Sequence, residues 1–367
     1  MAATPESGSL LIADLTGYTA YLSRGELEHA PTIAGDLLET IVGRLEPPFR
    51  LAKFEGDAAF LFAEDGRADA SLLLDSIEAS YVAFRRRLRS IEQATTCDCN
   101  ACSQAPRLDL KFFVHHGQYV RSRIAGHDEL AGSAIIVVHR LLKGVTAQAA
   151  HDDDGRASGF AVFTGQALAQ LGLDPGAANL RFGSESIEHL GEVVTYTMDL
   201  EARWQSETER RRLTIAETEA LFELDVTVRA QPAAVWAQLT APALRPTWEG
   251  PIVISESAVD GRRGVGTTAQ CVTGRLATLE EIVDWQPYDH VGYRLAVPDV
   301  GPVYATYDLA ETDGGTNVRL RWAAGGPQPA DEETIGRLVR EKRTALDRLA
   351  AVLGAGRMRA VAEEVGR

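Results

Sequence analysis

Apolar and polar positions along the first two hundred residues recur with two different periods, and this pattern predicts strands interleaved with helices. Residues 9–14 (SLLIAD) form a short apolar run that stops at the turn Thr16-Gly17, which is typical of a buried strand. Over residues 18–45 the apolar positions recur at helical spacing until Pro47 and Pro48 end the pattern. The same reasoning predicts strands at 50–54, 58–63, 108–115, 160–164 and 193–200, and helices at 71–93 and 134–142. This alternation indicates an α/β sandwich.

After about residue 220 the pattern becomes one strand after another. Residues 222–228 (FELDVTV) alternate strictly between apolar and polar, and 233–239 form a short helical stretch entered through Pro232. Further strands are predicted at 253–257, 267–272, 277–285, 290–296, 304–310 and 316–323. A long amphipathic helix closes the chain, with its apolar stripe at Ile335, Leu338, Val339, Leu346, Leu349, Val352 and Leu353. We therefore expect an antiparallel sheet that curves around a long C-terminal helix.

Residues 201–219 (EARWQSETERRRLTIAETE) separate these two parts, and they are charged and poor in apolar side chains, as is typical of a linker. We predict a first domain at 1–200, a linker at 201–219, a second domain at 220–355 and a tail at 356–367. A length of 367 residues is itself that of about two domains. The expected fold class of the whole chain is therefore α+β or α/β.

Composition and charge narrow the classes of function. The formal net charge of −15 repels phosphate backbones and anionic lipids, so we expect neither nucleic-acid binding nor membrane insertion. No run approaches the ~20 apolar residues of a membrane span, and the N-terminus lacks the basic and apolar regions of a signal peptide. Four cysteines in a chain of this length do not form a disulfide scaffold. A reducing, cytoplasmic location is expected.

The first stretch that carries chemistry is Asp14-Leu15-Thr16-Gly17-Tyr18-Thr19. An Asp at the end of a buried strand, followed by a glycine turn into a helix, can hold a hard cation. The backbone N–H groups at the helix start can bind phosphate oxygens. The alternative is that Asp14 only caps the helix.

The second stretch is Lys53-Phe54-Glu55-Gly56-Asp57, in which the glycine predicts a tight hairpin. On adjacent strands Asp57 can face Asp14, and two such carboxylates can share a pair of cations roughly 4 Å apart, as phosphoryl transfer requires. An ordinary turn aspartate is the alternative. The third stretch, His115-His116-Gly117, ends a predicted strand. The fourth, residues 132–141 (GSAIIVVHRL), places Arg140 on a predicted helix, where it could stabilise charge on phosphate or be a surface residue.

Taken together, the four stretches resemble the catalytic domain of class III adenylyl and guanylyl cyclases. That family carries strand-Asp-x-x-Gly-aromatic-Thr, Lys-x-x-Gly-Asp, His-x-Gly and Gly-x-x-Val-Asn-x-Ala-x-Arg-Leu, and counterparts occur here in that order. The resemblance covers about residues 8–200 and implies a ferredoxin-like cyclase sandwich. It also implies a homodimer whose active site lies between the two copies. The metal carboxylates would come from one copy, and the base-binding residues and the arginine from the other.

The resemblance implies a role for each matching residue. Asp14 and Asp57 would hold two Mg²⁺ or Mn²⁺ ions, and Arg140 would stabilise the transition state. Residues Thr16, Gly17 and Tyr18 would bind the nucleotide. In the family, the 3′-hydroxyl of ATP attacks the α-phosphate, so the implied products are cAMP and pyrophosphate.

The resemblance also implies how the base is recognised. Lys53 would donate to adenine N1, and Glu129 would accept from the N6 amino group, at a position where adenylyl cyclases carry an Asp. A donor beside an acceptor fits adenine better than guanine. The implied substrate is therefore ATP.

Two positions depart from the family pattern. The asparagine that orients the ribose is Ile136 here, and a side chain that cannot form hydrogen bonds should lower the rate by ~10²–10³. A phosphate-binding lysine is also missing near residues 191–193. These departures leave open a slow cyclase, another nucleotide reaction, or a catalytically silent sensor that uses the fold to bind a ligand and to dimerise.

A cluster of cysteines lies between the second predicted helix and the strand that follows it. Thiolates at the spacing Cys97-x-Cys99-x-x-Cys102 can hold Zn²⁺ or an iron–sulfur cluster. Three ligands are one short of a closed site, and Cys271 lies in the other domain. His115 or His116 could complete the set. The alternative is a reduced loop without metal.

Residues 220–355 resemble the START-like (SRPBCC, polyketide cyclase-like) family, whose fold is a helix grip around a deep pocket. The resemblance rests on residues 222–228, on Pro232-Ala233-Ala234-Val235-Trp236, on Trp248-Glu249-Gly250 and on the terminal helix. It implies a small hydrophobic ligand. Candidate pocket residues, each also a candidate for plain core, are Trp248, Trp285, Tyr293, Tyr304 and Trp322. A third hypothesis makes this domain the enzyme, but the sequence shows no catalytic set for it.

Overall fold

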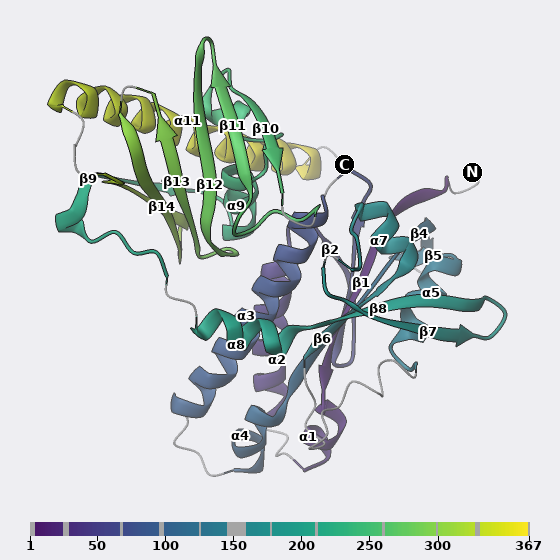
Figure 1. The fold of residues 1–367 in the computed structure, drawn as a ribbon. Helices are drawn as coiled ribbons and strands as arrows, with labels where there is room; N and C mark the ends of the chain where they lie inside the picture. Colours follow the sequence, from purple (N-terminus) through teal and green to yellow (C-terminus); the bar gives the residue numbers. More distant parts are fainter. Residues whose placement is uncertain are drawn as a thin grey trace. The chain divides into compact units, whose positions relative to one another are not determined.

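The computed structural model describes residues 4–24, 29–66, 69–94, 99–124, 126–144, 159–176, 178–209, 212–258, 261–298, 300–326 and 331–365. The chain divides into two compact units, Met1–Glu209 and Arg210–Arg367 (Figure 1). This division falls inside the segment 201–219 that was expected as a linker. None of the described helices is long and apolar enough to cross a membrane.

The first unit is built on one mixed sheet. Its strands are β1 (Glu6–Thr16), β2 (Arg50–Glu55), β3 (Ala58–Glu64), β4 (Asp109–Ile124), β5 (His127–Ala131), β6 (Phe160–Thr164), β7 (Arg181–Ile187) and β8 (Gly191–Asp199). The strand order is β2-β3-β1-β4-β6-β8-β7, and β5 pairs with the outer part of β4. Only β4 and β6 among these pairs are parallel. Figure 1 shows β7 and β8 as a hairpin that projects from the body of the unit.

Helices cover both faces of this sheet because its central strands are apolar on both sides. The helices are α1 (Tyr18–Arg24), α2 (Ala30–Leu45), α3 (Ala70–Ala94), α4 (Asn100–Gln104), α5 (Ser133–Leu141), α7 (Gly165–Leu171) and α8 (Leu200–Glu209), with a 3₁₀ turn η1 (Ala105–Arg107). Leu11 and Phe112 face the core formed with α2, α3, α7 and α8. Leu10 and Phe113 face the opposite core, against which α5 packs. The unit is thus a sheet between two helical layers.

Several elements differ from the sequence prediction. The helix predicted over 18–45 is two helices, α1 and α2, because Pro31 lies in the first turn of α2 and favours a new helix start there. The strand predicted to stop at residue 115 continues to Ile124 as β4, since its residues up to Tyr119 pair with β1 and residues 120–124 pair with β5. Strands β5 and β7 and helices α4 and α7 were not predicted.

The second unit is an antiparallel sheet with helices packed against it. Its strands are β9 (Ala220–Val228), β10 (Val253–Ser257), β11 (Thr268–Thr273), β12 (Leu276–Gln286), β13 (His290–Val297), β14 (Gly301–Thr312) and β15 (Gly315–Ala324), in the order β10-β11-β12-β13-β14-β15-β9. Its helices are η2 (Glu217–Glu219), α9 (Pro232–Thr240), α10 (Pro246–Glu249) and α11 (Glu332–Val365). Helix α11 packs against β9, α9 and α10 through its stripe at Leu338, Leu346 and Leu349. The expected mixed α/β class of the whole chain is confirmed.

Candidate functional site

Asp14 and Asp57 are neighbours across the paired strands β1 and β3. Asp14 lies near the end of β1, where its register partners are Ala58 on β3 and Lys111 on β4. Asp57 occupies the β2–β3 turn directly before Ala58, and its carbonyl oxygen accepts a hydrogen bond of 3.2 Å from the Leu15 backbone N–H. The hairpin that precedes β3 therefore brings the second carboxylate to the end of the first strand.

The two carboxylates are electrostatically coupled. Burial, followed by the charge of Asp57, raises the pKa of Asp14 to about 7, although Lys111 opposes the shift. Burial also raises the pKa of Asp57 and lowers that of Lys111. Two partly buried carboxylates that resist joint ionisation are relieved by a divalent cation, which prefers oxygen ligands. The residues present therefore fit Mg²⁺ or Mn²⁺ by the chemistry of their donors.

The turn after β1 has the conformation that the sequence suggested. Gly17 has φ +86°, a region that favours glycine, and its carbonyl accepts from the Tyr21 N–H at 2.9 Å to start α1. The Thr16 hydroxyl oxygen is buried and has no hydrogen-bond partner among the described residues. Tyr18 packs at the edge of the core. The turn thus holds one polar group that the described part of the chain leaves without a partner.

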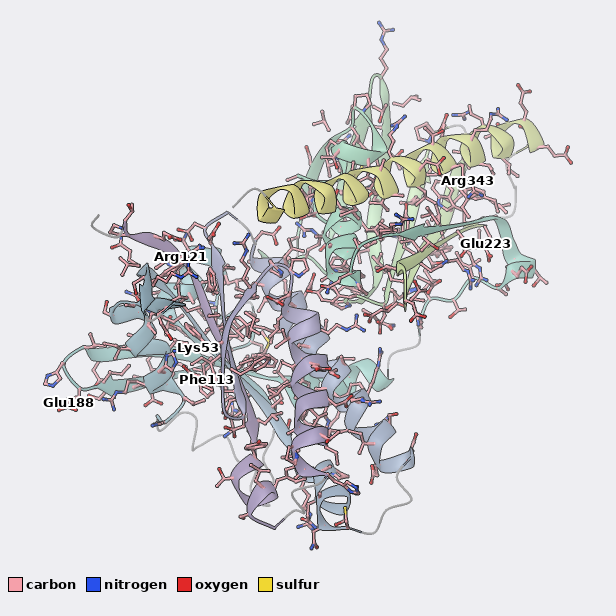
Figure 2. The ribbon with its side chains drawn as sticks, turned by 180° about the vertical axis from the view of Figure 1, so that it is seen from behind. Lys53, Phe113, Arg121, Glu188, Glu223 and Arg343 are labelled. Atoms are coloured by element: carbon pink, nitrogen blue, oxygen red, sulfur yellow. The ribbon has the colours of Figure 1, made fainter. Side chains whose placement is uncertain are left out.

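Lys53 and Glu129 form an ion pair although they are far apart in the sequence. Lys53 Nζ on β2 lies 3.1 Å from Glu129 Oε2 on β5 and 3.2 Å from Glu55 Oε1. The bond to Glu129 is the main reason that the pKa of Lys53 is raised. Figure 2 labels Lys53 on the first unit. Because β2 is an edge strand and β5 pairs only with β4, the pair lies at the border of the sheet.

Helix α5 is joined to this pair through a residue that the sequence analysis did not single out. His139 Nε2 on α5 lies 2.9 Å from Glu55 Oε2, and His139 Nδ1 lies 2.8 Å from the Ile135 carbonyl oxygen. Glu55 thus contacts both Lys53 and His139. Both residues lie inside the four stretches described above, and this position could have indicated them. Glu55 is two residues after Lys53, and His139 directly precedes Arg140.

Arg140 and Ile136 lie one turn apart on the outer face of α5. The inner face is formed by Ala134, Val137, Val138 and Leu141. Arg140 is exposed, and within the described part of the chain its side chain has no hydrogen bond or ion pair. Ile136 is 52% exposed, which is unusual for a large apolar side chain. One chain therefore does not bring Arg140 to Asp14 or Lys53.

The two histidines of the third stretch contact other residues than those expected. His115 Nδ1 lies 2.9 Å from Thr164 Oγ1, and burial lowers the pKa of His115 to about 4. His116 Nε2 lies 2.8 Å from Asp65 Oδ1. Neither joins the cysteines, so the expectation that one of them would complete that cluster is wrong. Gly117 has a packing role, because a Cβ there would lie 2.7 Å from Ala134 Cβ on α5.

The cysteine cluster contains a different histidine. His29, Cys99 and Cys102 place their ligand atoms within 4.8 Å of one another. Cys97, the remaining member of the predicted cluster, lies outside the described residues. His29 is 70 positions away from Cys99 in the sequence, so the spacing of the cysteines gave no indication of it.

The five aromatic residues proposed for a pocket in the second unit have separate surroundings. Trp248 donates from Nε1 to the Gln238 carbonyl oxygen at 2.8 Å. The other ring contacts are Trp285 with Trp236, Tyr293 with Tyr307, and Trp322 stacked on Phe222, while Tyr304 is half-buried. A hollow of about 680 Å³ in this unit is lined by strands β10 to β14, and none of the five is among its described lining residues.

Next to this hollow lies a buried ion network. Arg245 Nη1 lies 2.7 Å from Glu280 Oε2, and Arg245 Nε lies 2.6 Å from Glu249 Oε1. Burial opposes the charge, yet the two carboxylates keep the pKa of Arg245 well above its ordinary value. Glu280 is itself a lining residue of the hollow. The hollow therefore combines apolar and charged walls.

A second hollow, of about 1140 Å³, lies in the first unit. It is lined by β4, α5, α7 and the β7–β8 hairpin, and His115 is among its lining residues. Asp14, Asp57 and Lys53 are absent from the described residues that line it. The metal and base candidates therefore do not share this hollow.

Comparison with known proteins finds two family models. Residues 34–150 match a family described as "Protein of unknown function (DUF2652)", and residues 219–354 match "Polyketide cyclase / dehydrase and lipid transport". An uncharacterized protein of Mycobacterium tuberculosis is 37% identical over 107 residues, which are 29% of this chain and 50% of that protein. The chain thus matches only about half the length of this curated relative.

Among solved structures, similar ones include two adenylyl cyclases. The adenylyl cyclase CyaB from P. aeruginosa is 13% identical, with 58% of this chain and 100% of that chain covered and a TM-score of 0.38. A bacterial light-regulated adenylyl cyclase is 12% identical, with 56% and 57% covered and a TM-score of 0.40. Protein CV1439 from Chromobacterium violaceum is 17% identical, with 36% and 96% covered and a TM-score of 0.31. The chain joins a part similar to a family of unknown function to a part similar to the polyketide cyclase family.

Proposed function

We propose that the first unit is a divergent class III nucleotide cyclase of the adenylyl type, which converts ATP to cAMP and pyrophosphate. The observation that carries this proposal is the 3.1 Å pair between Lys53 and Glu129. These two residues come from strands that are not neighbours in the sequence, and the fold places a cationic donor beside an anionic acceptor. That is the complement of the N1 acceptor and the N6 donor on the Watson–Crick edge of adenine.

Glu55 supports this role for Lys53. An ammonium group has three donors, and Glu129 and Glu55 orient two of them. The third remains to donate to the base. Glu129 has a second oxygen with which to accept from the amino group of adenine. Guanine, which presents a carbonyl oxygen at the equivalent position, would meet a repulsive carboxylate there.

Asp14 and Asp57 are the residues that would hold Mg²⁺ or Mn²⁺. Two bound cations would neutralise charge on the phosphate and at the attacking 3′-oxygen. The chain itself contributes the turn Thr16-Gly17, whose backbone N–H groups at the start of α1 would orient phosphate oxygens. Arg140, exposed and without an ion-pair partner in the described chain, is available to a phosphate held by a second copy. A homodimer is therefore part of the proposal.

In the second unit we propose a helix-grip pocket for a small hydrophobic ligand that regulates the cyclase. The support is the match of residues 219–354 to a family of polyketide cyclases and lipid-transport proteins. The hollow beside Glu280 adds a charged wall, so a ligand with one polar group fits it better than a pure hydrocarbon.

A catalytically silent nucleotide sensor is the second candidate function, and Ile136 favours it. At the position where the cyclase pattern has a hydrogen-bonding asparagine, this chain exposes an apolar side chain. Loss of one orienting contact lowers a rate by ~10²–10³. A chain that binds ATP and metal but turns over at such a reduced rate would act through its bound state.

The test is to incubate the full chain with ATP and Mn²⁺ and to measure cAMP, with Asp57→Ala and Asp174→Ala alongside. Asp174 is an exposed residue whose side chain accepts from the Gly176 N–H, so its variant controls for the loss of a carboxylate. We expect cAMP from the wild type and from Asp174→Ala, and none from Asp57→Ala. If no cAMP is formed but calorimetry shows that ATP binds, the sensor hypothesis would replace the cyclase hypothesis. Neither product nor binding would overturn both.

A further inference from the structure

A histidine and two cysteines from distant parts of the chain converge at one corner of the first unit. His29 Nδ1 lies 3.3 Å from Cys99 Sγ and 3.7 Å from Cys102 Sγ. All three ligand atoms lie within 4.8 Å of one another. His29 is the N-cap residue of α2, and the cysteines belong to α4 and its N-cap. None of these three residues is among the carboxylates and base residues of the proposed nucleotide site.

The separations of these atoms fit a tetrahedral zinc ion. With Zn–S bonds of about 2.3 Å and Zn–N bonds of about 2.0–2.1 Å, a nitrogen and a sulfur ligand of one zinc lie about 3.5 Å apart. The two nitrogen–sulfur distances, 3.3 and 3.7 Å, lie on either side of that value. Both nitrogen–sulfur pairs are therefore near the separation that one bound ion requires.

The local backbone also favours metal binding by the cysteines. Cys99 caps α4, and its Sγ accepts from the Cys102 backbone N–H at 3.4 Å. A hydrogen bond from a backbone N–H favours the thiolate, which is the form that binds metal. Cys102 is buried and Cys99 half-buried, while His29 is exposed. The two thiols are thus set back in the protein, and the histidine lies at its surface.

The mixed ligand set distinguishes zinc from the other metal centre considered for these cysteines. An iron–sulfur cluster is ordinarily held by four cysteine thiolates. The described cysteines of this corner are only two, and Cys271 belongs to the other unit. Thiolate and imidazole together are a ligand set that zinc prefers. We propose that His29, Cys99 and Cys102 bind one Zn²⁺ ion, and that this ion fixes the start of α2 to α4.

The position of the site gives the zinc a structural role. Helix α1 packs against both α2 and α4, and it follows directly after the turn that contains Gly17. Figure 1 shows α1 and α4 together at the same end of the unit. The zinc ion thus closes the corner on which the Thr16-Gly17 turn rests. Because the ligands are separated by 70 residues, the ion links parts of the chain that are far apart when unfolded.

The proposal is tested on the full chain purified with reductant and Zn²⁺. Zinc per chain is measured by elemental analysis, and Co²⁺ replaces it for absorption spectroscopy. The variants are Cys99→Ser, Cys102→Ser and His29→Gln, with Cys271→Ser and His189→Asn as controls, since Cys271 is a buried cysteine of the second unit and His189 an exposed turn histidine. Circular dichroism records whether each variant is folded.

We expect one zinc per wild-type chain, and a Co²⁺ form with thiolate charge-transfer bands and the visible bands of a tetrahedral site. Losing an outer-sphere partner lowers metal affinity by ~10–100-fold, so losing a ligand should weaken it at least about tenfold. The controls should retain zinc. If the cysteine variants fail to fold, the test uses the wild type. A chelator should lower its melting temperature and make Cys99 accessible to alkylation. Added Zn²⁺ should restore the melting temperature and the protection of Cys99.

Three results would overturn the proposal. They are a wild type without zinc and without thiolate bands, folded cysteine variants that keep full zinc content, and a Cys99–Cys102 disulfide that persists in the presence of reductant and Zn²⁺. None of these measurements involves nucleotide turnover. The zinc site can therefore stand if the cyclase activity fails, and the reverse also holds.

Discussion

His139 Nε2 lies 2.9 Å from Glu55 Oε2, and this contact joins helix α5 to the hairpin that carries Lys53 and Asp57. The His139 ring also meets Phe60 edge to face, with the ring centres 5.0 Å apart. Helix α5 also packs on the sheet through apolar side chains, which turn its inner face toward the sheet. The polar contact adds a fixed point beside Arg140, one residue further along, and so helps to set where Arg140 stands relative to the base-binding pair.

We predict that His139→Ala weakens ATP binding by about 2- to 10-fold, because a hydrogen bond of this kind contributes about 0.5–1.5 kcal/mol. Glu55 would then turn toward Lys53 and compete with the base for its donors. Calorimetry with ATP and Mn²⁺ measures the change. His139→Gln should restore most of the affinity, since its amide can donate to Glu55. An equal loss in both variants would mean that the ring packing against Phe60, and not the hydrogen bond, positions the helix.

The raised pKa of Asp14 predicts that the ionised form, which would bind the metal, destabilises the metal-free protein. The folded state raises the pKa of Asp14 to about 7, above the ordinary carboxyl value, so folding favours the protonated form. The stability of the metal-free chain should therefore fall as the pH rises from about 4 to about 7, and remain lower above that range.

Asp14→Asn should remove the part of this dependence that Asp14 contributes and leave the part due to Asp57, whose pKa burial also raises. In urea unfolding near pH 8 the variant should exceed the wild type by about 1–3 kcal/mol, and near pH 4 the two should agree. Added Mn²⁺ should reverse the order at pH 8, because only the wild type keeps the full pair of carboxylates for the ion. A variant less stable than the wild type at pH 8 without metal would contradict the assignment.

Glu129 should decide which nucleotide is used. Glu129→Ala should lower the preference for ATP over GTP by about 10- to 100-fold, since a site that pairs with a substrate polar group discriminates through it. Competition between the two nucleotides in the cyclase or binding assay measures the ratio. Glu188→Ala, which removes an exposed carboxylate from the turn between β7 and β8 of the same unit, is the matched control. An unchanged ratio in Glu129→Ala would remove Glu129 from base recognition.

The sequence predicted those parts of the fold and site that depend on local pattern. Strand β10 has the predicted bounds, and the turn glycines bring Asp57 beside Asp14 because β1 and β3 pair directly. The contacts that the sequence did not predict join residues through tertiary packing. His29 reaches the cysteines across 70 positions, so the nearer His115 and His116 were considered in its place. The proposed pocket aromatics show the same limit, because alternation along a strand does not tell which face a hollow occupies.

The segment before β9 is fastened to the second unit by a pH-sensitive cluster. The Leu213 N–H donates to Asp284 at 2.7 Å, Arg212 donates to Asp308 at 2.7 Å, and His290 lies between the two carboxylates. Burial opposes its charge, but the bonds to Asp284 and Asp308 raise the pKa of His290 above its ordinary value. Burial also opposes the charge of both carboxylates, yet His290 lowers the pKa of each.

The directions of these pKa shifts limit the stability of this cluster at both high and low pH. The contribution of His290 is fully present below the ordinary histidine pKa of about 6.5 and is lost as the pH rises through its higher folded value. The carboxylates contribute above about pH 4 and lose their contribution as the pH falls through their lowered values. Hydrogen exchange at the Leu213 amide, corrected for intrinsic rates, should show highest protection near pH 5–6. His290→Gln should flatten the alkaline limb; protection that keeps falling above pH 7 in that variant would exclude His290 as its cause.

The network around Arg245 should be the least tolerant ionic site of the second unit. The guanidinium is buried between Glu249 and Glu280, so its removal leaves two carboxylates without their cation in a site that excludes water. Breaking a buried ion pair costs about 3–5 kcal/mol, whereas replacing all its members with apolar groups of similar size is much less harmful.

We therefore predict that Arg245→Met lowers the free energy of unfolding by about 3–5 kcal/mol, measured by urea unfolding of the full chain. The triple variant with Glu249→Met and Glu280→Met, which replaces the whole network by apolar side chains of similar size, should recover most of it. Arg275→Met, at an exposed turn between β11 and β12, should stay within about 0.5 kcal/mol of the wild type. Failure of the triple variant to recover would mean that the network stabilises the unit through its geometry, for instance by holding α10 against β12, and not only through its charge balance.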